Sequence, residues 1–153
     1  RVHDVANPRY AASRPSWVSD AGGLLGEGDR VKLEALCEDV QARWHAEVAV
    51  VLLRSLPPDV QPSGFAAALL NYWGVGDKTL HTGLLVLLLQ EQRRLEMRVG
   101  FGAGRVLGPE RLRGIQEEHM VPVLRSGAAG EALCAGLRAV VAALEEGAPP
   151  RWR

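Results

Sequence analysis

Lysine is nearly absent from this chain, and so is any excess of charge of either sign. Lys32 and Lys78 are the only lysines, yet arginine brings the basic residues to 18, which equals the number of acidic residues. A neutral chain has no general electrostatic attraction to nucleic acid or to an anionic membrane surface. We therefore expect no nucleic-acid partner.

Cysteine is equally scarce. Cys37 and Cys134 are the only two, and each falls on the apolar face of a predicted helix. This placement favours buried free thiols that pack as small hydrophobic side chains, with a disulfide between them as the alternative. Neither has another cysteine or a histidine at the spacing of metal ligands, so no metal site is predicted at either.

No hydrophobic run is long enough to cross a bilayer. The run Gly83–Leu89 (GLLVLLL) is short and unbroken, which suits a strand buried on both of its faces. The chain starts at Arg1 rather than at methionine, so we expect that an N-terminal segment has been removed or left out. The residues shown contain no signal-peptide core and no transmembrane segment.

The motifs of nucleophilic and phosphate-binding enzymes are missing as well. The sequence has no G-x-S-x-G, and Gly100–Gly104 (GFGAG) lacks the lysine and the serine or threonine of a P-loop. We interpret these glycines as allowing close backbone packing at the edge of a sheet.

The four histidines, His3, His45, His81 and His119, do not cluster at ligand spacing. His119 is predicted on or beside the apolar face of a helix, where a partly buried structural role is favoured. His45 follows a predicted helix, where a cap is the plain interpretation. His81 lies in a glycine-rich loop before the Gly83–Leu89 run, and a solvated loop side chain is favoured there over a functional one.

A hairpin is predicted at the centre of the fold. After Gly83–Leu89 comes a polar turn, and then Arg94–Val99 alternates between charged and apolar side chains. Leu95, Met97 and Val99 point to one face while the charged residues point to the other. A fully buried strand is therefore joined to a more peripheral one.

The remaining elements predict an α/β protein. Two helices are expected before the hairpin, one over 27–46 and one from an N-cap at Ser63 to Gly74, with another buried strand over 47–53 between them. Two more are expected after the hairpin. The first begins at Pro109 and is kinked or ended by Pro122, and the second runs from about residue 128 to 144. This order predicts a three-layer α/β/α sandwich around a small mixed sheet. We divide the chain into an extended arm (1–16), one folded domain (17–146) and a flexible tail (147–153).

Seven segments together resemble the TPM domain family. The order and spacing of the segments carry the resemblance, which extends from Trp17 to about residue 144. The segments are Trp17–Leu25, Ala46–Val51, Tyr72–Gly76, Gly83–Leu89, Arg98–Gly102, Glu117–Pro122 and Gly136–Val140.

The resemblance implies an α/β/α sandwich that is exported or lies in the thylakoid lumen, often beside a membrane. Some members are reported to bind calcium or to show weak acid phosphatase activity. The acidic pocket of the family draws on three acidic positions, and only the first is kept here, as Asp20. His81 and Thr82 stand where the family has an Asp-Asn pair, and Gly104 stands where it has an acid.

Calcium prefers several oxygen ligands, and carboxylates are common among them. Replacing two acidic positions by histidine and glycine removes charged ligands, so we hypothesise that the metal site is lost or severely weakened. Asp20 and Asp77 are the remaining metal candidates, and no cofactor is expected.

Our leading hypothesis is a non-catalytic accessory or assembly subunit of a membrane-associated protein complex, for which a photosystem on the thylakoid lumen side is one setting. Segments 2–15 and 149–153 are its predicted docking segments, expected to be disordered when unanchored. The alternative is a weak acid phosphatase or calcium-binding exported domain that uses Asp20, Asp77 and His81. The expected location is the thylakoid lumen or the bacterial periplasm, peripheral to a membrane, and the sequence leaves both open.

Overall fold

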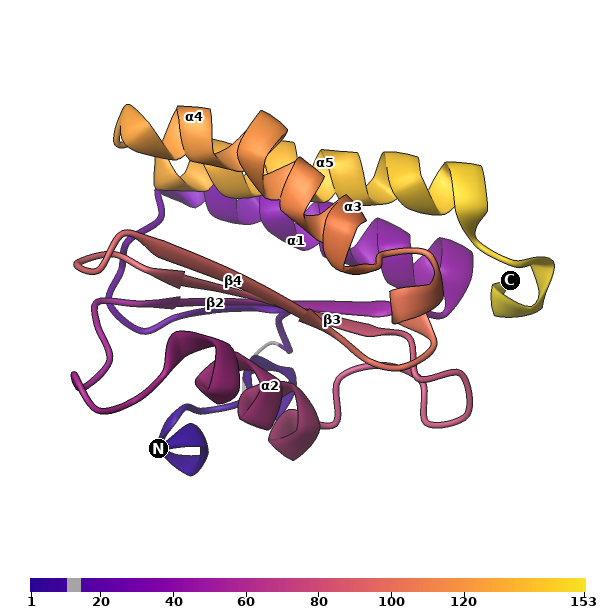
Figure 1. Ribbon diagram of the computed structural model, residues 1–153, viewed down its shortest axis with the longest axis horizontal. Helices are drawn as coiled ribbons and strands as arrows, with labels where there is room; N and C mark the ends of the chain where they lie inside the picture. The colour runs from indigo at the N-terminus through magenta and orange to yellow at the C-terminus, as the bar shows by residue number, and fades with distance from the viewer. Residues whose placement is uncertain (11–14) are drawn as a thin grey trace.

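The computed structural model describes residues 1–10 and 15–153. Its core is one mixed sheet with the strand order β1-β2-β3-β4, in which β1, β2 and β3 are parallel and β4 is antiparallel to β3 (Figure 1). The strands are β1 (Val18–Asp20), β2 (Glu47–Leu53), β3 (Gly83–Leu89) and β4 (Arg94–Val99).

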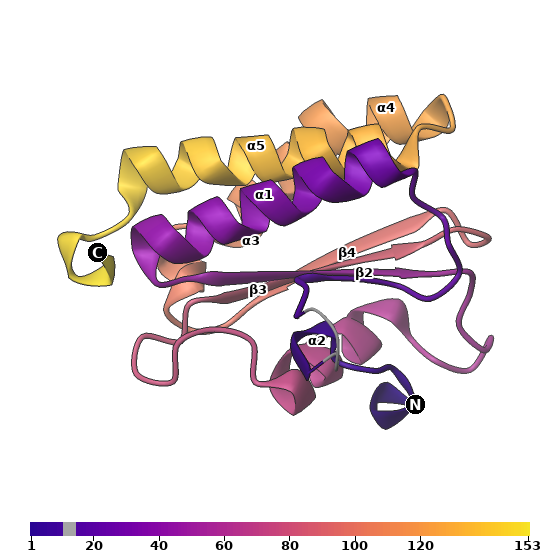
Figure 2. The same cartoon turned by 180° about the vertical axis from the view of Figure 1, so that it is seen from behind.

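Helices cover both faces of this sheet, which confirms the predicted α/β/α sandwich. Figures 1 and 2 show α1, α3, α4 and α5 on one face and α2 on the other. The helices are α1 (Glu27–Trp44), α2 (Pro62–Trp73), α3 (Pro109–Ile115), α4 (Val121–Arg125) and α5 (Ala129–Gly147). Shorter helical turns are η1 (Val2–Asp4), η2 (Pro8–Tyr10), η3 (Ala103–Arg105), the π-helix η4 (Gln116–Met120) and η5 (Pro150–Trp152).

The central strands follow the sequence pattern. Their predicted bounds, 47–53, 83–89 and 94–99, are confirmed residue for residue. Every residue of β3 is buried, because β3 lies between two other strands and has helices on both sides. Its side chains alternate, so that Val86 packs with the α1 and α5 cluster while Leu87 packs with the α2 cluster.

The predicted bounds of three helices and one missed strand need correction. The helix α1 ends at Trp44 rather than at residue 46, and α5 ends at Gly147 rather than at about residue 144. The N-cap of α2 is Gln61 rather than Ser63, because Pro62 supplies the first helical residue with its φ already fixed. The short apolar segment after Trp17 forms a strand, β1, which was not predicted because three residues are too few to show a period.

Pro122 neither ends nor sharply breaks its helix. A single π turn, η4, joins α3 to α4, and the N–H of Val121 bonds to the carbonyl of Gln116, five residues back. Because Pro122 has no N–H of its own, the wider turn lets it occupy the first turn of α4, where no donor is required.

The two terminal segments differ from the extended arm and flexible tail expected from sequence. Trp152 is only 1% exposed and packs with the main core cluster. Val2 and Val5 pack against the α2 cluster, and the indole Nε1 of Trp73 donates to the carbonyl of Val5 at 3.3 Å. Residues 11–14 of the predicted arm lie outside the described residues. Among the described residues, no helix combines the length and the hydrophobicity needed to cross a membrane.

Candidate functional site

Asp20 closes the turn that follows β1. Its two carboxylate oxygens each accept a backbone N–H at 2.9 Å, from Leu24 and from Leu25. Its carbonyl accepts a further N–H from Gly23 at 3.2 Å. The carboxylate therefore holds a turn of the backbone, which is a sufficient structural reason for an acid at this position.

The loop before β3 brings together three of the other residues singled out from the sequence. Asp77 accepts the N–H groups of Leu80 at 2.9 Å and Thr79 at 2.8 Å, and these bonds lower the pKa of its carboxyl, with further lowering by the charges of His45 and His81. His81 is exposed and has a left-handed backbone with φ of 56°. Thr82 is buried, and its hydroxyl donates to the carbonyl of His45 at 2.8 Å.

The glycines after β4 pack their backbone against this loop. A Cβ on Gly102 would stand 1.8 Å from the carbonyl oxygen of Leu80, and one on Gly100 would stand 2.8 Å from that of His81. The predicted close backbone packing is confirmed. Gly104 is different, because a Cβ there would meet only a methyl group of Val99 at 3.6 Å. Local packing therefore leaves room for a side chain at this position.

Asp20 and Asp77 lie at opposite ends of the parallel strands. Asp20 pairs with Leu52 at the end of β2, whereas the loop of Asp77 precedes Gly83, which pairs with Glu47 at the start of β2. Five residue steps separate these two register positions, which corresponds to about 17 Å along the strands. Within residues 1–10 and 15–153, no group of three or more His, Cys, Asp or Glu side chains is placed to hold a metal ion.

Both cysteines are free and buried, which confirms the favoured interpretation. Burial raises the pKa of the Cys37 thiol well above its ordinary value, and the carboxylates of Glu34 and Glu38 raise it further. Such a thiol stays protonated and is a poor nucleophile. The cysteines thus act as packing residues between α1 and α5.

His119 corrects the prediction of a partly buried histidine. Its side chain is 49% exposed, and Nε2 lies 3.9 Å from a carboxylate oxygen of Glu118. The π turn inserts an extra residue into the helical repeat, so that Met120 faces the core and His119 faces outwards. Spacing alone, read with the α-helical period, could not show this rotation.

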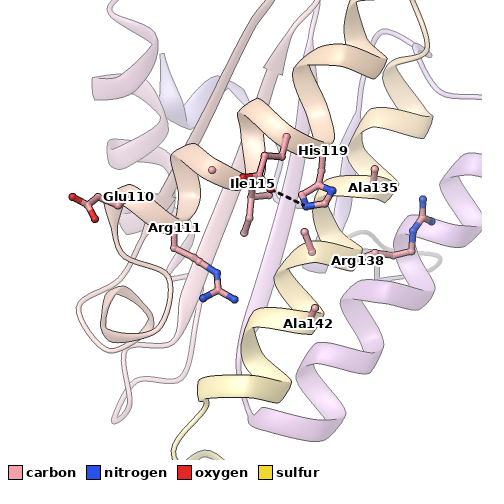
Figure 3. A pocket seen from close by; sticks show the side chains of 10 residues that line it. Glu110, Arg111, Ile115, His119, Ala135, Arg138 and Ala142 are labelled. Atoms are coloured by element: carbon pink, nitrogen blue, oxygen red, sulfur yellow. Dashed lines mark ion pairs between the residues drawn. The ribbon is translucent and has the colours of Figure 1, made fainter.

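A concave feature at the surface of the helical layer was not predicted. It is a groove of about 820 Å³ between the α3–η4 segment and α5 (Figure 3). Its lining residues are Glu110, Arg111, Gly114, Ile115, Glu118, His119, Ala135, Arg138, Ala139 and Ala142. The only sequence signal was the row of small residues on the outer side of α5, which looks like an ordinary solvent-facing helix.

Charged side chains surround this groove without forming a catalytic cluster. In Figure 3, His119 extends over α5 and Arg111 extends between the two helical segments, while Glu110 and Arg138 point away on opposite sides. Arg111 reaches across to Glu146 of α5 at 3.2 Å. The groove is therefore a small-residue floor with polar, exposed borders.

The fold and its loops define a class, an α/β/α sandwich with a four-stranded mixed sheet and a glycine-packed loop before the central strand. The model of the TPM domain matches residues 18–143, and the chain belongs to the TPM domain family. This agrees with the resemblance carried by the sequence segments. None of the curated proteins matches the chain significantly.

Solved structures of bacterial proteins share this fold. The N-terminal domain of a protein from P. gingivalis is 31% identical, with a TM-score of 0.83, and the match covers 95% of this chain and 92% of that one. The N-terminal domain of the cg2496 protein from Corynebacterium glutamicum is 18% identical, with 92% and 90% covered and a TM-score of 0.69. The BA42 protein from Bizionia argentinensis is 14% identical, with 88% and 89% covered and a TM-score of 0.73.

Proposed function

We propose that this TPM domain is a non-catalytic accessory or assembly subunit that binds a protein partner within a membrane-associated complex. The groove between α3–η4 and α5 is the observation that carries the proposal. Its volume of about 820 Å³ lies within the usual range of binding pockets, roughly 300–1,000 Å³.

The lining of the groove suits one kind of occupant, a helical segment with a small apolar contact face and a carboxylate at its border. Ala135, Ala139 and Ala142 have no side chain beyond Cβ, so the backbone of a partner helix could approach α5 closely. Arg111 and His119 line the same groove and supply donors for a partner carboxylate. Their present ion pairs are exposed, and such pairs contribute about 0–1 kcal/mol, so exchanging partners costs little.

The proposed setting is outside the cytoplasm, in the periplasm or a plastid lumen, and peripheral to a membrane. Membership of the TPM domain family supports this setting. The solved relatives come from bacteria, which supports a bacterial complex over a photosystem in the thylakoid lumen. The partners in this proposal are protein subunits.

The test compares Ala142→Trp with Ala42→Trp in the source organism. Both alanines are exposed on helices, but only Ala142 lines the groove. On native gels of solubilised membranes, the unchanged chain and Ala42→Trp should migrate with one defined complex, and Ala142→Trp should migrate free. If all three chains migrate free, or all three stay bound, the groove is not the binding surface.

The rival function is a weak acid phosphatase or a calcium-binding domain. The lowered pKa of Asp77 beside His81, whose left-handed backbone is strained, favours it, because strained backbone clusters at active sites. Asp20 lies at the other end of the strands and would have to act separately. Hydrolysis of a generic phosphomonoester that falls on Asp77→Asn would support this rival over the binding function.

A further inference from the structure

The outer edge of β4 is unpaired in the described structure. β4 pairs with β3 on one side, and no described strand lies on its other side. Figure 1 shows β4 at the front of the sheet, between the α3–α4 layer and α2. An open edge strand is a template for pairing with another chain.

The hydrogen-bonding pattern between β3 and β4 determines which backbone groups of β4 point outwards. The N–H of Gly100 donates to the carbonyl of Gly83 at 2.9 Å, which makes these two residues a hydrogen-bonded pair. Because hydrogen-bonded pairs recur at every second position, Arg94, Glu96 and Arg98 bond to β3. The N–H and carbonyl groups of the intervening residues therefore face away from the sheet. These are Leu95, Met97 and Val99.

The side chains along this edge form two distinct rows. Leu95 and Val99 are only partly buried against the main core cluster, so apolar surface is left uncovered at the edge. On the other face, Glu96 pairs with Arg94 at 2.8 Å. Arg98 is exposed and makes no ion pair among the described residues. A partner strand that completes both rows would supply apolar groups on one face and an acid opposite Arg98.

We infer that the occupant of this edge is β4 of a second copy, paired antiparallel with Met97 opposite Met97 across a two-fold axis. In this register Glu96 stands opposite Arg98 of the second copy, twice by symmetry. Leu95 stands opposite Val99, and opposite residues in a sheet point to the same face. Both rows are then completed by the same strand.

The two nearest symmetric registers that keep the outward groups facing each other are unfavourable. One places Glu96 opposite Glu96 and Arg94 opposite Arg98, and the other places Arg98 opposite Arg98. Like charges directly opposite each other destabilise a sheet. Of these three registers, charge therefore favours the one centred on Met97.

The resulting dimer has one continuous sheet of eight strands, four from each copy. Three outward N–H groups from each copy find acceptors, which makes six new backbone hydrogen bonds. This edge contains none of the residues that line the groove between α3–η4 and α5, so the dimer is independent of the proposed function.

The experiment is sedimentation velocity over a concentration series with the unchanged chain, Glu96→Arg, Arg98→Glu and the double variant. The unchanged chain should shift reversibly from one to two copies as concentration rises. Each single variant creates like-charge pairs and should weaken dimerisation by about tenfold or more. The double variant restores opposite charges and should dimerise within about threefold of the unchanged chain.

Lys32→Glu is the matched control, because Lys32 is exposed on α1, and α1 packs on β1 and β2 at the other side of the sheet from β4. It should dimerise like the unchanged chain, and circular dichroism should show that every variant is folded. An unchanged chain that stays monomeric throughout the series overturns the inference. Dimerisation that survives both single reversals, or that the double variant fails to recover, overturns it as well.

Discussion

Nδ1 of His45 lies 2.7 Å from the carbonyl oxygen of Trp152. A carbonyl can only accept, so Nδ1 carries the hydrogen and donates it. This bond ties the last turn of the chain to the residue that ends α1, where His45 adopts a left-handed backbone. The C-terminal segment is thereby part of the packed domain.

Trp152→Ala should lower the free energy of unfolding by about 3 kcal/mol or more, because it removes a large side chain from the core. The indole is 1% exposed and belongs to the main core cluster. Urea denaturation followed by circular dichroism measures the change. Arg151→Ala, which alters an exposed neighbour, should change the stability by less than about 0.5 kcal/mol. Equal effects of the two variants would show that the segment is not packed as described.

Glu34→Ala should lower the free energy of unfolding by about 2 kcal/mol, because the Glu34 carboxylate on α1 accepts hydrogen bonds from the backbone at the start of β1. Glu34 accepts the N–H of Trp17 at 3.1 Å and that of Val18 at 3.0 Å, and it also accepts the hydroxyl of Ser16. Hydrogen exchange at Trp17 and Val18 should accelerate along with the loss of stability. Glu110→Ala, an exposed acid on α3, is the control, and exchange at β1 that is equal in both variants would contradict this role.

Gly102→Ala should destabilise the domain by about 2 kcal/mol, whereas Gly104→Ala should be nearly neutral. The new Cβ at 102 would overlap the carbonyl of Leu80, which is backbone and can move only with the whole loop. At 104 the nearest group is a methyl at an ordinary contact distance. Thermal unfolding of the two variants checks the prediction, and the reverse order of stability would contradict it.

Calcium should bind weakly or not at all. By the resemblance, His81, Thr82 and Gly104 stand at acidic or amide positions of the family pocket, and Asp20 lies at the opposite end of the strands from Asp77. Isothermal titration calorimetry of the metal-free protein with calcium measures this directly. Tight binding that disappears in Asp20→Ala would overturn the hypothesis of a lost site.

Cys37 should resist thiol reagents in the folded protein. Its raised pKa also predicts that stability falls with pH above the ordinary thiol value of 9.0, because the unfolded chain then releases the Cys37 proton while the folded chain keeps it. Below that value the contribution is fully present. Urea titrations from pH 7 to 10 on the unchanged chain and on Cys37→Ala give the free energy of unfolding at each pH, and the slopes of that energy against pH are compared. Parallel slopes above pH 9 would contradict the prediction.

The order of apolar and polar residues predicted the strands of the central hairpin, because the burial of each strand determines which of its positions are apolar. An unbroken apolar run such as Gly83–Leu89 fits a strand covered on both faces, and the alternation in Arg94–Val99 fits a strand with one polar face. The same reasoning failed at β1, because three residues are too few to show a period. It also failed at His119, because the π turn shifts the helical period there.

The family, the fold class and the bounds of the three long strands follow from the sequence by itself, because they depend on neighbours in the chain and on the order of its segments. Only the tertiary structure decided that Asp20 and Asp77 lie apart, that α5 and η4 border a groove, and that Trp152 is buried. These are relations between distant segments. Their distances depend on strand order and helix packing, which the spacing of residues along the chain does not contain.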